Sequence, residues 1–100
     1  MNFQFDVSEA SVALSGELTF ADHEAFREIA DRLFKGPRRS VAIDLSRLEF
    51  IDSAGLGMLL IARDEAIKAE RKVVLRNPQG QVKRIFAATN FDTLFTVENG

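Results

Sequence analysis

The side chains with the most scope for chemistry lie in one segment, residues 50–57, which reads Phe-Ile-Asp-Ser-Ala-Gly-Leu-Gly. Ser53 is the only hydroxyl in it, and it stands where an apolar strand is predicted to give way to an apolar helix. Asp52 or Ser53 could cap that helix by accepting a hydrogen bond from a first-turn N–H group. Each glycine in a helix costs about 0.5–1 kcal/mol relative to alanine, so Gly55 and Gly57 indicate that something approaches the backbone closely.

The predicted helix start at Ser53 would also accommodate an anion. Its free N–H groups and the helix macrodipole place partial positive charge there. A phosphate on Ser53 would add about −1.5 to −2 charges at this point, and the neighbouring Asp52 would oppose it. A modification balanced in this way can change the surface without dismantling the fold.

Other catalytic chemistries lack their residues. The chain has no cysteine and one histidine, which excludes disulfides, thiolate sites and multi-histidine metal centres, so no cofactor or metal is expected. A hydrolase elbow, Gly-x-Ser-x-Gly, would need glycine where Ile51 stands, and His23 is interpreted as a solvated surface residue. A phospho-aspartate receiver could use Asp44 and Asp52 near strand ends, but the first strand offers only Asp6 to its acidic cluster. We therefore expect no enzymatic activity.

Length and charge restrict the remaining classes. With 100 residues, 46% hydrophobic and 28% charged, residues 1–100 are expected to form a single globular domain. A net charge of −2 argues against binding to nucleic acid or an anionic membrane. No segment is apolar and long enough to cross a bilayer, and the N-terminus does not resemble a signal peptide. The chain is expected to be cytoplasmic, without membrane insertion.

Hydrophobic periodicity predicts the elements that must position Ser53. Alternation of period two indicates a hairpin, and later periods alternate between helical faces and short apolar runs. Strands are expected over 3–7, 12–16, 41–45, 73–75 and 91–97; helices are expected from 21 to the Gly36-Pro37 break, from about 53 to 70, and from Asn77-Pro78 onward. The order is β-β-α-β-α-β-α-β. This pattern predicts an α/β fold, a mixed β-sheet with helices mainly packed on one face.

Three apolar side chains near the segment have two interpretations each. Either one of Leu56 and Met58 is exposed for a partner, or both belong to the core. Phe20 is either a staple for the first helix or a contact at the rim of the partner site. Thr19 and Asp22 have the spacing of a capping box for that helix.

Asp52-Ser53-Ala54-Gly55-Leu56-Gly57 resembles the signature of the STAS domain, which bacterial anti-sigma factor antagonists share with the cytoplasmic domains of sulfate transporters. Four other segments resemble the family's second strand, the strand before the signature, the third helix and the closing segment: 14–18, 41–45, 82–86 and 91–97. The stand-alone length resembles the antagonist branch. Thr19 departs from the family, since many members carry an acidic residue there, and Ala54 leaves one acceptor where some members have two.

The resemblance implies a phosphorylation-switched anti-sigma factor antagonist. Its unphosphorylated form would bind an anti-sigma factor that is also a serine kinase, phosphorylation of Ser53 would release it, and a serine phosphatase would reverse the step. The implied partner-binding residues are Thr19, Phe20, Asp52, Ser53, Ala54, Gly55, Leu56, Gly57 and Met58. The chain would be monomeric alone. A non-switching STAS subunit of a transport complex, such as a lipid-transport ATPase, is the alternative.

Overall fold

The computed structural model describes residues 1–99 and contains the elements in the predicted order, β-β-α-β-α-β-α-β. The strands are β1 Asn2–Asp6, β2 Ser11–Leu18, β3 Ser40–Ile51, β4 Lys72–Arg76 and β5 Thr96–Glu98. The helices are α1 His23–Phe34, α2 Ser53–Lys68 and α3 Gly80–Ala88, with short 3-10 turns η1 at Phe20–Asp22 and η2 at Phe91–Thr93.

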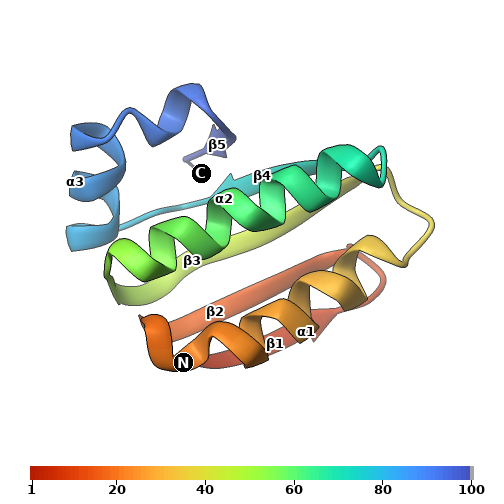
Figure 1. Cartoon of the computed structure of the whole chain (residues 1–100), viewed down its shortest axis with the longest axis horizontal. Helices are drawn as coiled ribbons and strands as arrows, with labels where there is room; N and C mark the ends of the chain where they lie inside the picture. The colour runs from red at the N-terminus through yellow and green to blue at the C-terminus, as the bar shows by residue number, and fades with distance from the viewer. Residues whose placement is uncertain (100) are drawn as a thin grey trace.

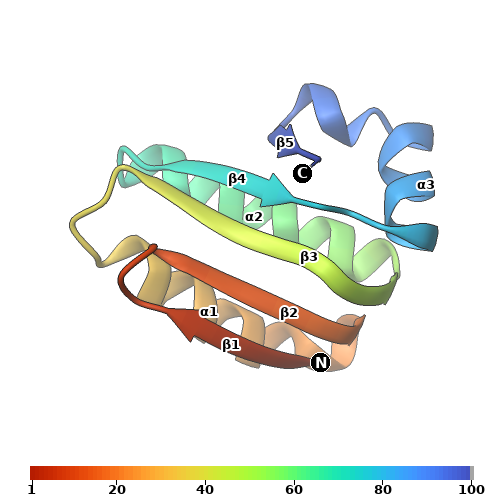
Figure 2. The same ribbon diagram turned by 180° about the vertical axis from the view of Figure 1, so that it is seen from behind.

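The five strands form one sheet in sequential order, β1-β2-β3-β4-β5. β1 is antiparallel to β2, and the other neighbouring pairs are parallel. Each parallel connection therefore moves one strand further in the same direction, so right-handed crossovers place their helices on the same side. Figures 1 and 2 show α1 and α2 side by side on one face, the opposite face bare, and α3 beyond the end of β4.

The core fills the space between this sheet and the two long helices. α1 contributes Phe26, Ile29 and Leu33, which recur at helical spacing and are all buried. α2 contributes an apolar face that includes Leu59 and Ala62, and the inward side chains of β2, β3 and β4 complete the layer. α1 and α2 each begin near the carboxyl end of the preceding strand. The position of β3 in the sheet therefore determines where α2 starts.

Two predicted helix boundaries are wrong. The third helix begins at Gly80 and not at Asn77-Pro78, because Asn77 has a positive φ of 56° and its N–H donates to the Glu98 carbonyl, continuing the pairing of β4 with β5. α2 ends at Lys68, since Glu70 turns left-handed with φ 58°. Neither change moves the Ser53 segment.

Candidate functional site

Asp52 holds the turn between β3 and α2. Its Oδ1 accepts the N–H of Gly55 at 2.7 Å, which makes Asp52, and not Ser53, the N-cap of α2. Its Oδ2 accepts the N–H of Phe20 at 3.4 Å, and its own N–H donates to the Leu18 carbonyl at 3.3 Å. One carboxylate therefore joins the start of α2 to the segment that follows β2.

The two glycines of the segment have different surroundings. A Cβ at Gly55 would lie 2.5 Å from the Leu18 carbonyl oxygen and 2.6 Å from Ile51 Cγ1, so only glycine lets the first turn of α2 rest on the strand ends. A Cβ at Gly57 would meet nothing within 4 Å. The internal packing therefore explains Gly55 and leaves Gly57 without an internal steric reason.

Ser53 is exposed at the first position of α2. Within residues 1–99 its hydroxyl has no hydrogen-bond partner, and the N–H groups of Ser53 and Ala54 also have none. Asp52 is the N-cap of α2, so the Ser53 hydroxyl is not needed to stabilise the start of the helix. The site therefore presents a free nucleophilic oxygen beside two unused backbone donors.

Phe20 lies next to this turn and is 67% exposed. Its ring stacks on His23 with the centroids 5.0 Å apart, which places Phe20 at the rim and not in the core. Thr19, half-buried, donates its N–H to Asp22 Oδ2 at 2.9 Å, so the predicted capping box forms, but it begins η1 and not α1. This hydrogen bond lowers the pKa of Asp22 from its ordinary value of 3.8, against some desolvation.

Leu56 and Met58 are both core residues, with exposed fractions of 9% and 8%. Of the two interpretations, the one that exposes Leu56 or Met58 is therefore wrong, because α2 places Leu56 in the core and Met58 faces α1. The exposed apolar side chains of α2 are instead Ile61 at 64% and Ile67 at 57%. Gly55, another expected contact residue, is also buried, so it packs beneath the exposed residues of the site.

Gln81 of α3 is a supporting residue that the sequence did not indicate. Its Oε1 accepts the Ile51 N–H at 3.0 Å and its Nε2 donates to the Ile51 carbonyl at 3.0 Å. β4 pairs with β3 only as far as Asp44, so the side of β3 that faces α3 would otherwise lack partners at Ile51. Only the position of α3 in space reveals this role, since glutamine in a helix carries no distinctive pattern.

No group of three or more His, Cys, Asp or Glu side chains that could hold a metal ion occurs in residues 1–99. In the same range no helix has the length and apolarity to cross a membrane.

The fold agrees with a known family. A family model described as "Mlab, STAS domain" matches residues 1–97. The chain belongs to the STAS domain family. The STAS family is also indicated by a STAS-domain containing protein of Pseudomonas aeruginosa, 36% identical over 92 residues, which are 92% of this chain and 90% of that protein.

Further relatives include proteins named for regulation. BtrV of Bordetella bronchiseptica, provisionally named an anti-sigma factor antagonist, is 33% identical over 86% of this chain and 74% of its own length. The anti-sigma factor antagonist SpoIIAA, solved unphosphorylated, is 25% identical with a TM-score of 0.64, covering 93% of this chain and 97% of that one. The phosphorylated form of Bacillus SpoIIAA gives a TM-score of 0.69 at 24% identity, over 96% and 90%. These names describe regulatory and not catalytic proteins.

Proposed function

We propose that this chain is an anti-sigma factor antagonist controlled by phosphorylation of Ser53. The unphosphorylated chain binds an anti-sigma factor that is also a serine kinase, which then transfers the γ-phosphoryl group of ATP to the Ser53 oxygen, leaving ADP. The phosphorylated chain dissociates, and a serine phosphatase hydrolyses the ester to inorganic phosphate and free Ser53. The chain itself contributes no catalytic group.

The observation that carries the proposal is the free hydroxyl of Ser53 at a helix start that Asp52 already caps. A residue with a structural role would be held by hydrogen bonds, whereas this oxygen is exposed. The relatives named as antagonists, including one solved in phosphorylated and unphosphorylated forms, support the same assignment.

Charge explains how the phosphate would act. The two unused N–H groups and the macrodipole offset part of the dianion, each favourable contact contributing about 0.3–1 kcal/mol, so the fold tolerates it. A partner seated over Ser53 and Gly57 would bury the same dianion beside Asp52. Burial of a charge without a cation costs several kcal/mol, and each 1.4 kcal/mol is about tenfold in affinity.

The proposed partner surface consists of the exposed or half-exposed residues of this region: Thr19, Phe20, Asp52, Ser53, Ala54 and Gly57. Gly55, Leu56 and Met58 hold these residues in place from the buried side. Phe20 is the aromatic contact of this surface, because it presents a largely exposed ring beside the turn.

Incubation with the cognate serine kinase and ATP, followed by peptide mass mapping, tests the proposal. Phosphate is expected on Ser53 alone, and it should be absent from Ser53→Ala while the matched control Ser46→Ala, an exposed serine of β3, is still modified. Phosphate on Ser40, Ser46 or Thr19 with Ser53 unmodified would overturn it. If the chain is instead a non-switching subunit of a transport complex, Ser53→Asp should bind the partner with the same affinity as the native chain.

A further inference from the structure

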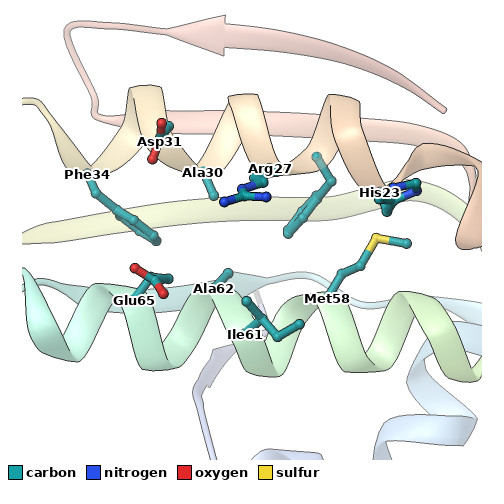
Figure 3. A pocket seen from close by; sticks show the side chains of 10 residues that line it. His23, Arg27, Ala30, Asp31, Phe34, Met58, Ile61, Ala62 and Glu65 are labelled. Carbon is teal, nitrogen blue, oxygen red and sulfur yellow. The ribbon is translucent and has the colours of Figure 1, made fainter.

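α1 and α2 enclose a groove of about 480 Å³ on the face of the molecule that carries the helices (Figure 3). Its apolar lining includes Phe34 of α1 and Met58 and Ile61 of α2. Ile61, a large aliphatic side chain, is 64% exposed at the rim of this apolar lining. The groove thus has a buried apolar floor and an apolar rim that the fold leaves uncovered.

The rim also carries two charged side chains that form no ion pair among the described residues. Arg27 and Asp31 of α1 line the groove, and neither forms an ion pair within residues 1–99. Glu65 of α2, whose Oε1 is 4.0 Å from Lys68 Nζ, lies at the same end of the groove as Asp31 and Phe34 (Figure 3). A ligand that fits should therefore carry positive charge at the Phe34 end and negative charge near Arg27.

The groove continues from the Ser53 surface. Ser53, Gly57 and Ile61 follow one another at i, i+4 and i+8, so they share one stripe of α2. His23, which stacks on Phe20, lies with Met58 at the opposite end of the groove from Phe34. A protein that contacts Ser53 and Phe20 would therefore meet the groove next.

We propose that this groove binds an amphipathic helix of about three turns from the protein whose binding Ser53 controls, an inference that rests on the proposed function. The groove follows the 12 residues of α1, which span about 18 Å at 1.5 Å per residue. A helix laid there would cover Ile61 and remain open to water on its outer side, whereas small ligands are mostly enclosed by their pockets.

The groove and the phosphorylation site should act independently. Ser53 and Ile61 are two helical turns apart, about 12 Å along the axis, which exceeds the screening length of about 8 Å at physiological salt. Substitutions at the two positions should therefore have additive effects on the binding free energy.

A photo-crosslinking amino acid, p-benzoylphenylalanine, placed at position 61 or 67 in living cells identifies the occupant. Ile67 is a matched control, because it is a similarly exposed isoleucine of α2 that does not line the groove. From position 61 we expect an adduct to an amphipathic helical segment of another protein, and none to that segment from position 67. An adduct to a second copy of this chain, an adduct to a lipid, equal yields from both positions, or no adduct would each overturn the proposal.

Calorimetric titration of that purified protein then separates the two claims. Ile61→Glu should weaken binding by about tenfold or more, and Ile67→Glu by less than about twofold, with circular dichroism confirming that both variants fold. Glu65→Lys should weaken binding more than Asp64→Lys, since only Glu65 lines the groove. If Ser53→Asp weakens binding and Ile61→Glu does not, the groove proposal fails alone; if only Ile61→Glu weakens binding, the phosphorylation switch fails and the groove stands.

Discussion

Gly55 and Gly57 differ at the residue scale in what surrounds their missing side chains. Gly55→Ala should lower the free energy of unfolding by about 1–3 kcal/mol, because its Cβ would overlap the Leu18 carbonyl and Ile51. Gly57→Ala is the matched control and should raise it by about 0.5–1 kcal/mol, because alanine favours a helix. Urea denaturation of both variants measures the difference. Equal effects would show that the close approach at Gly55 is not restrictive.

Asp52 and Ser53 are adjacent, and only Asp52 accepts a hydrogen bond from the helix. Asp52→Ala should therefore lower the free energy of unfolding by about 0.5–2 kcal/mol, while Ser53→Ala should change it by less than about 0.5 kcal/mol. Thermal unfolding compared with the native chain measures both. A larger loss for Ser53→Ala would mean that its hydroxyl, and not the carboxylate, caps α2.

Asp22 gives the stability a dependence on pH. Its pKa is lowered in the folded chain, mainly by the Thr19 N–H and further by the amino group of Met1 at 3.3 Å. The stabilisation is present above the ordinary value of 3.8 and is lost as the pH falls through the lower folded value. Between about pH 5 and about pH 2, the free energy of unfolding should therefore fall less for Asp22→Asn than for the native chain. Asp92→Asn, an exposed control, should behave like the native chain; if Asp22→Asn also does, the hydrogen bond is not linked to folding.

At the scale of elements, α3 is joined to the end of β3 by two side-chain hydrogen bonds. Gln81 alone occupies both backbone groups of Ile51, one residue before the cap of α2. Gln81→Ala should accelerate hydrogen exchange of the Ile51 amide by about tenfold or more, since it removes the only acceptor of that N–H in residues 1–99. Gln79→Ala is the control, because the Gln79 side chain donates a hydrogen bond to the Asn77 carbonyl and makes none to Ile51 in the described part of the chain. Unchanged exchange at Ile51 would show that α3 does not hold the strand end.

Sequence patterns predict the order of the elements, but two expected strands have the wrong bounds. The expected closing strand over 91–97 is the 3-10 turn η2 followed by the three-residue β5, and β3 continues to Ile51 beyond the expected 41–45. Period two in β1 and β2 and the helical face of α1 depend on local spacing, so they were readable directly. The start of α3 was not, because Asn77 continues the β4–β5 pairing through Glu98, a residue far along the chain. Proline after asparagine is typical of a helix start, but here the hydrogen bond from Asn77 to Glu98 moves that start to Gly80.

At the scale of the whole molecule, the STAS-like topology brings Phe20 and Ser53 together. They follow β2 and β3, which are parallel neighbours, so their ends lie at one edge of the sheet. That juxtaposition could be predicted from the element order. The α1–α2 groove and the outward direction of Ile61 could not, because they depend on how far apart two helices settle on the sheet.

The central claim is that a phosphate on Ser53 prevents partner binding by local charge and leaves the fold intact. Calorimetric titration of the anti-sigma factor kinase with the unmodified and the Ser53-phosphorylated chain tests it most directly. We predict an affinity at least about tenfold weaker for the phosphorylated chain, with an unchanged circular dichroism spectrum and a similar melting temperature. Equal affinities of the two forms, or a phosphorylated chain that has unfolded, would contradict the account.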